Sequence, residues 1–115
     1  MTTKENMIVV AIVNAGFAED VMEAATTAGA KGGTIINARG SAKKEAENIF
    51  NITITPDKEI VLIIVKNEIV SDILHAIYKK VGLNSPGNGI AFSIPADEVV
   101  GIKERQTNNQ NEVAK

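Results

Sequence analysis

The sequence predicts an α+β fold in which a four-stranded antiparallel sheet carries two helices on one face. Two apolar runs, residues 7–13 and 59–65, are too short for typical helices and consist mainly of branched aliphatic side chains, which favour strands. Two other segments, residues 17–28 and 67–81, place apolar side chains at helical spacing. Glycine, proline and asparagine residues separate these segments, so strands and helices alternate along the chain.

The first half of the chain supplies two strands and a helix. We expect residues 7–13 to form a buried central strand, because the run is apolar throughout. The helix at 17–28 carries Glu19 and Asp20 in its first turn, where the helix dipole favours acidic side chains. Residues 34–38 are predicted to form the second strand.

The middle of the chain is a long connection followed by another strand. Residues 39–48 are charged and lack a clear period, which predicts a loop, and residues 49–54 alternate in part, which favours a returning strand. Residues 59–65 are apolar throughout, so we expect this strand to be covered on both faces.

The last part of the chain supplies a helix and a strand. The helix at 67–81 is predicted to end at Gly82, and residues 84–89 are rich in turn-forming types. A last core strand is expected at 90–94, followed by a short element at 96–102. The order β-α-β-β-α-β is that of the split β-α-β or ferredoxin-like plan.

Length and composition narrow the organisation and the classes of function. With 115 residues, we expect one domain over 1–105 and a disordered polar tail over 106–115. A net charge of −2 without a basic stripe argues against nucleic acid as the partner, and the lack of cysteine excludes disulfides and thiolate chemistry. The apolar run 7–13 is too short for a signal peptide or a membrane span, so the expected location is the cytoplasm.

The usual parts of a catalytic site cannot be assembled from the sequence. His75 is the only histidine, and a partly exposed position on the second helix is its simplest interpretation. Asp97 and Glu98 are adjacent and would point apart in a strand. Ser41 and Ser85 stand in no nucleophile or phosphate-loop motif. We therefore predict a protein that is not an enzyme and has neither a metal site nor a resident cofactor.

The glycine-rich stretch near residue 87 is the most informative candidate for a binding site. Gly87 and Gly89 can adopt positive φ, so successive backbone N–H groups there can converge on one anion. Pro86 would stiffen the approach. An ordinary helix-to-strand turn has the same composition, and the sequence leaves both interpretations open.

Several short stretches, taken together in this order, resemble the PII signalling family over about residues 7–105. They are Gly-Ala-Lys-Gly-Gly-Thr at 29–34, Arg39-Gly40 before a charged loop, Gly87-Asn88-Gly89, Ile-Ala-Phe at 90–92 and Val-Val-Gly-Ile-Lys at 99–103. The resemblance implies a homotrimeric regulator, used in nitrogen regulation, that binds adenine nucleotides in clefts between subunits. It also implies that the loop 40–58, the T-loop of the family, contacts a membrane transporter or an enzyme.

The same resemblance assigns roles to individual residues. Thr34 would lie near the adenine, Arg39 and Gly40 at the start of the T-loop, and Gly87, Asn88 and Gly89 in the phosphate-binding B-loop. Lys103 would stand at one of two positions where the family has arginine.

The chain also departs from the family pattern. Asn88 and Ile90 stand where the family has an aspartate and a lysine, and Gly101 and Lys103 stand where it has two arginines. Each lost contact to a charged group costs about 1.5–3 kcal/mol, so a small adenylate with less charge than ATP, such as a mononucleotide, fits the remaining groups better. The loop 40–58 is shorter than in the family and has Phe50, but no tyrosine, as its aromatic residue.

Three alternatives on the same fold find less support. A metal-binding trimer of the copper-tolerance type would lack cysteine and have His75 as its one histidine. A small acylphosphatase-like hydrolase needs an arginine near the N-terminus, yet residues 8–20 contain no basic side chain. An RNA-binding sheet needs a pattern of exposed aromatic residues, which the few aromatic residues here do not form.

Overall fold

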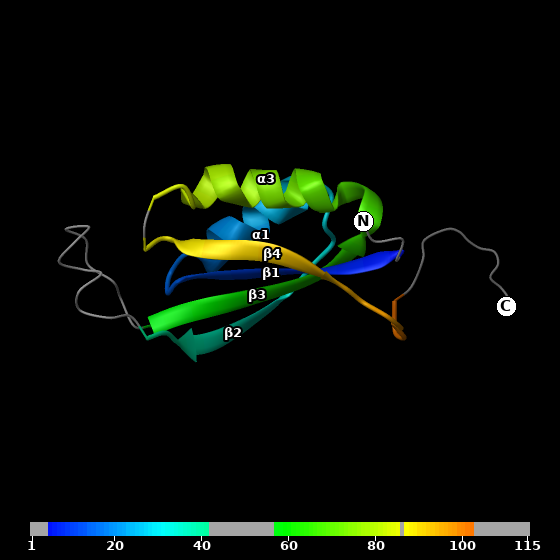
Figure 1. Ribbon diagram of the computed structural model, residues 1–115, viewed down its shortest axis with the longest axis horizontal. Coiled ribbons are helices and arrows are strands. Elements are labelled where there is room, and N and C mark those ends of the chain that lie inside the picture. The colour runs from blue at the N-terminus through cyan, green and yellow to red at the C-terminus, as the bar shows by residue number, and fades with distance from the viewer. Residues whose placement is uncertain (1–4, 42–56, 86, 103–115) are drawn as a thin grey trace, which may run out of the picture.

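Alternation between apolar runs and turn residues produces four strands and two helices, which a computed structural model describes for residues 5–41, 57–85 and 87–102 (Figure 1). The elements are β1 (Asn6–Asn14), α1 (Ala18–Thr27), β2 (Thr34–Arg39), β3 (Asp57–Lys66), a 3-10 turn (Asn67–Ile69), α3 (Val70–Val81) and β4 (Gly89–Pro95).

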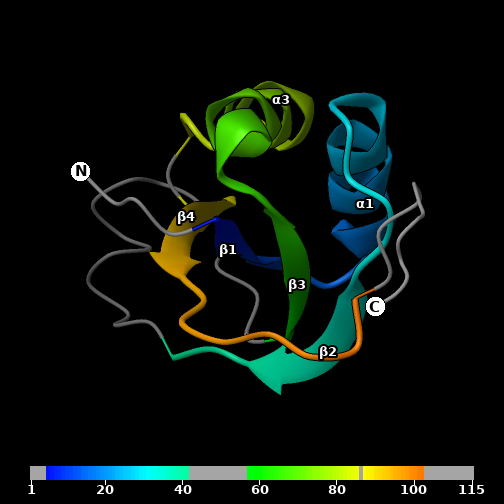
Figure 2. The same cartoon turned by 90° about the vertical axis from the view of Figure 1, so that its right-hand side faces the viewer.

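The four strands form one antiparallel sheet in the order β2-β3-β1-β4. Both helices lie on the same face of the sheet, as Figure 2 shows in a view along the strands. This arrangement confirms the predicted ferredoxin-like fold. It also confirms β1 as a central strand, with β3 on one side and β4 on the other.

The core lies between the sheet and the two helices. Val9, Val13, Val61 and Ile63 point from the two central strands towards the helices and are fully buried. Val21 and Ala25 of α1 and Ile73 and Ile77 of α3 meet them and are also fully buried. Aliphatic side chains, mostly branched ones and alanine, fill this core, and no aromatic side chain of the described residues is part of it.

The opposite face of the sheet, which we call the open face, is not covered by the helices, and this differs from one prediction. The run at 59–65 was expected to be covered on both faces and the run at 7–13 to be buried, but among the described residues the helices cover only one face of these strands. Strand alternation places every second apolar side chain on the open face: Ile8, Val10, Ile12, Ile36, Ile60, Leu62, Ile64, Ile90, Phe92 and Ile94.

Two further predictions near the C-terminus are wrong. β4 was expected to be a core strand, but it is an edge strand in which Ile90, Phe92 and Ile94 are exposed. Residues 96–102 form neither a helix nor a strand. They run from β4 across the end of the sheet towards β2 (Figure 2).

Several predictions fall outside the described residues. These are the returning strand at 49–54, the polar tail at 106–115, Pro86 and Lys103. The described helices are too short and too polar to cross a membrane.

Candidate ligand site

The glycine loop, which we define as Gly87, Asn88 and Gly89, lies where α3 connects to β4. Gly87 has a φ of 86° and Gly89 a φ of 134°, values that side chains rarely tolerate. At Gly89 a Cβ atom would also overlap the carbonyl oxygen of Ile12 on β1. Glycine is therefore required for β4 to begin this close to β1.

The side chain of Asn88 is occupied by the fold. Its Nδ2 donates to the carbonyl of Gly82 at 3.0 Å and more weakly to that of Val81 at 3.4 Å. These carbonyls end α3, where Gly82 is left-handed with a φ of 76°, and the last carbonyls of a helix lack partners within it. Asn88 thus stabilises the helix end through Nδ2.

Lys58 is a cationic residue beside the glycine loop that the sequence did not single out. Its Nζ donates a 2.6 Å hydrogen bond to Oδ1 of Asn14, and Nδ2 of Asn14 donates to the carbonyl of Gly87 at 3.1 Å. Its stem lies over Gly40, since a Cβ atom there would be 2.9 Å from Cε of Lys58. The only sequence signal was a lysine directly after the Thr-Pro-Asp turn.

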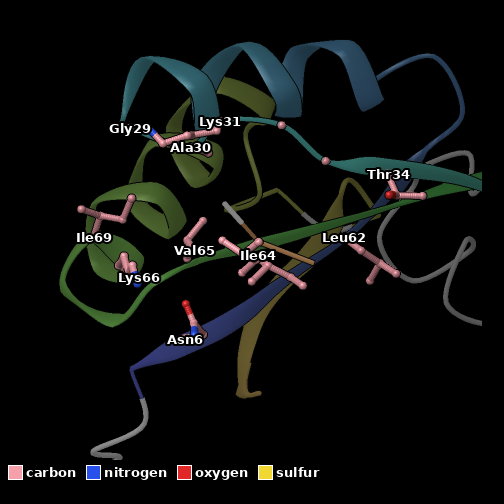
Figure 3. A pocket seen from close by; sticks show the side chains of 13 residues that line it. Asn6, Gly29, Ala30, Lys31, Thr34, Leu62, Ile64, Val65, Lys66 and Ile69 are labelled. Carbon is pink, nitrogen blue, oxygen red and sulfur yellow. The ribbon is translucent and has the colours of Figure 1, made fainter. Parts of the chain in front are cut away.

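A pocket of about 640 Å³ lies at the β2 edge of the sheet, which is the edge opposite to β4 and the glycine loop (Figure 3). Leu62, Ile64 and Ile69 contribute apolar surface, and Ile102 reaches the pocket from the C-terminal segment. The loop 29–33 forms a wall made largely of backbone. A pocket that is largely apolar but has a few peptide and polar groups in its wall is typical of sites for small molecules.

The loop wall of the pocket is held tightly against the core. A Cβ atom at Gly33 would lie 2.9 Å from Sδ of Met22 and 3.0 Å from Cγ1 of Ile63. At the neighbouring Gly32, a Cβ atom would meet nothing within 4 Å. Gly33 is therefore required by packing, whereas Gly32 faces open space.

Polar side chains also line the pocket. Thr34 begins β2, and Lys31, Lys66 and Asn6 also line the pocket. Nζ of Lys66 donates to Oε2 of Glu5 at 2.8 Å, and this hydrogen bond, with the attraction between the charges, lowers the pKa of Glu5. The pocket lining thus combines apolar side chains with two lysines, of which Lys66 is paired with Glu5.

The predicted site residues fall into two groups that the single chain keeps apart. Thr34 belongs to the pocket at the β2 edge, whereas the glycine loop leads into β4 at the opposite edge. Gly40 is linked to the glycine loop by a series of contacts: the stem of Lys58 lies over Gly40, and Lys58 bonds to Asn14, which bonds to Gly87. Arg39, the exposed last residue of β2, lies opposite Asp57 in the register of β2 and β3, at the same end of the sheet.

The residues considered for catalysis are all exposed: Ser41, His75, Ser85, Asp97 and Glu98. His75 is exposed on α3 and stacks on Tyr78 with a ring separation of 6.5 Å. Within residues 5–41, 57–85 and 87–102, no three histidine or acidic side chains come together as metal ligands would.

Comparisons with known proteins agree with this geometry. The family model "Nitrogen regulatory protein P-II" matches residues 7–106. A search of curated proteins finds no match. Among solved structures, the crystal structure of Arabidopsis thaliana PII bound to citrate matches with a TM-score of 0.66 and 23% identity, covering 86% of this chain and 82% of that one. The chain therefore belongs to the nitrogen regulatory protein P-II family, and it is a PII-like signalling protein.

Proposed function

We propose that the protein is a cytoplasmic homotrimer that binds a small adenylate between its subunits and signals to a partner protein through segment 40–58. One observation carries the proposal. The Thr34 pocket and the glycine loop lie at opposite edges of the same sheet. A ligand that contacts both must therefore lie between the β2 edge of one copy and the β4 edge of the next.

The open face supports assembly. Ile64 is 46% exposed, Ile90 57% and Ile94 43%, and they belong to a face that is apolar across all four strands. A contiguous apolar surface of this kind marks an interaction site. A domain of this size also gains from burying more surface than it can bury alone.

The chemistry of the two half-sites favours a ligand with few charges. The pocket suits an adenine ring through Leu62, Ile64 and the backbone of the loop 29–33. At the glycine loop, Ile90 is apolar and exposed, so Lys58 is the cation nearest to Gly87 that the described contacts identify. One phosphate matches one lysine better than three phosphates do.

The position of segment 40–58 supports a signalling role. Gly40 at its start and Lys58 at its end contact each other beside the glycine loop. A ligand bound there acts directly on both ends of the segment. By analogy with the family, we propose a membrane transporter or an enzyme as the partner and nitrogen regulation as the process.

Light scattering after size exclusion, followed by calorimetry with ATP, ADP, AMP and cyclic AMP, tests the proposal. We expect a trimer that binds AMP at least as tightly as ATP. Thr34→Val and Lys58→Met should each weaken binding, whereas Thr26→Val on the exposed face of α1 should not. A well-folded monomer, or a trimer that binds none of the four nucleotides, contradicts the proposal.

A further inference from the structure

We propose that Asn14 is a positioning residue that couples the glycine loop to the two ends of segment 40–58. The inference rests on the proposed function, because it describes how the state of the ligand site reaches the segment that contacts a partner. It concerns contacts within one chain, so it can be tested without a ligand.

Asn14 is the last residue of β1, and its side-chain amide joins two distant parts of the sequence. Oδ1 accepts the 2.6 Å hydrogen bond from Lys58, which lies 44 positions away, and Nδ2 donates the 3.1 Å bond to Gly87, which lies 73 positions away. Both bonds are partly shielded from water, so each is held more firmly than a fully exposed bond.

The amide can serve these two partners in only one orientation. An asparagine side chain has an acceptor at one end and donors at the other. Turning it over would place Nδ2 against the ammonium of Lys58 and Oδ1 against the carbonyl of Gly87, which replaces two attractions by two repulsions. Asn14 therefore bonds to Lys58 and Gly87 together, and a displacement of either one disturbs the other.

Lys58 extends this link to segment 40–58. Its stem lies over Gly40, with Cγ 3.2 Å and Cε 2.9 Å from the position of a Cβ atom there. At the other end of the segment, the N–H of Ala15 donates to the carbonyl of Asp57 at 3.0 Å. The start of the segment thus contacts Lys58, which bonds to Asn14, and its end is bonded to both Asn14 and Ala15.

An anion that binds at the glycine loop would alter the contacts between Lys58, Asn14 and Gly40. When its charge draws the ammonium of Lys58 away from Oδ1, Asn14 loses the partner that fixes its orientation, and the contact over Gly40 changes with it. In the reverse direction, a partner protein that moves Gly40 alters the carbonyl position of Gly87. Binding at one place and conformation at the other are coupled reciprocally.

The decisive experiment follows the amide resonances of Gly40 and Gly87 in the full, ligand-free protein by NMR. Lys58→Met removes the ammonium but keeps the aliphatic stem over Gly40. We expect Lys58→Met to shift the Gly87 resonance when residue 14 is asparagine, and this shift to disappear in the Asn14→Ala background. An equal shift of Gly87 in both backgrounds overturns the proposal.

Asn14→Asp separates the two bonds and serves as the second variant if Asn14→Ala does not fold. A carboxylate still accepts from Lys58 but has no donor for the carbonyl of Gly87. We expect Asn14→Asp to move Gly87 by itself and to make Gly87 insensitive to Lys58→Met. Persistence of that sensitivity overturns the proposal. Asn37→Ala, at an exposed position of β2, should move neither Gly87 nor its response to Lys58→Met.

A titration with AMP separates this inference from the proposed function. If AMP binds, Gly40 should move during the titration of the native protein and stay in place in Asn14→Ala, although AMP still binds. A Gly40 shift that is the same in both proteins overturns the coupling. If AMP and the other nucleotides do not bind, the proposed function fails, and the ligand-free comparison still decides the role of Asn14.

Discussion

Glu59 caps a helix that begins 41 residues before it in the sequence: its Oε1 accepts a 3.0 Å hydrogen bond from the N–H of Ala18. The same oxygen accepts a 2.9 Å bond from the N–H of Gly16. The N-cap residue of α1, Phe17, has no side-chain group for this purpose. β3 therefore supplies the cap that α1 lacks, and the carboxylate also complements the helix dipole.

Replacing Glu59 should destabilise the protein in graded steps. We expect Glu59→Ala to lower the free energy of unfolding by about 1–2 kcal/mol, because two N–H groups lose their acceptor. Glu59→Gln should cost less, since its amide oxygen still accepts. Urea denaturation measures both, with the exposed Glu98→Gln as a control that should change stability by less than about 0.5 kcal/mol. Equal stability of all three variants would show that the cap contributes nothing.

Two glycines with positive φ should differ in their response to alanine. Gly16 has a φ of 100° and open space around it, so Gly16→Ala should cost only the backbone strain of about 1–2 kcal/mol. Gly89→Ala adds the overlap with the carbonyl of Ile12 and should cost about 3 kcal/mol or more. Thermal and urea unfolding of both variants test the difference. A milder effect at Gly89 than at Gly16 would mean that β4 can move away from β1 easily.

The neighbouring glycines in the pocket wall form a second matched pair. Gly33→Ala should lower the free energy of unfolding by about 1–3 kcal/mol, because its Cβ atom would press on Met22 and Ile63. Gly32→Ala meets no neighbour within 4 Å and should stay within about 0.5 kcal/mol of the native protein. Urea denaturation tests the pair, and a similar cost at both positions would argue against tight packing of this loop on the core.

A charge on the open face should break the assembly without unfolding the chain. Ile64 on the open face and Tyr78 on α3 are both 46% exposed in the single chain. We expect Ile64→Lys to reduce the mass measured by light scattering to that of a monomer while circular dichroism stays unchanged, because a lysine would be buried between copies. Tyr78→Lys should leave the mass unchanged. An Ile64→Lys protein of native mass would exclude the open face as the interface.

Much of the fold was predictable because its signals are local. Short runs of branched aliphatic residues predicted β1 and β3, and helical spacing together with Gly82 predicted α3 and its end. The glycine loop was also visible, since few residues besides glycine tolerate positive φ. The coverage of the sheet was not predictable, because an apolar strand looks the same whether a helix or another copy of the chain covers its second face.

The sequence by itself determined the order of elements, the positions of the glycines and the uncharged residues at positions 90 and 101. Only the tertiary structure decided which residues share a site. It placed Thr34 and the glycine loop at opposite edges of the sheet, and it brought Asn14, Lys58 and Gly87 together. The physical reason is that hydrogen bonds between side chains depend on strand order and register. These are set by packing over the whole sheet and leave no local pattern around a single asparagine or lysine.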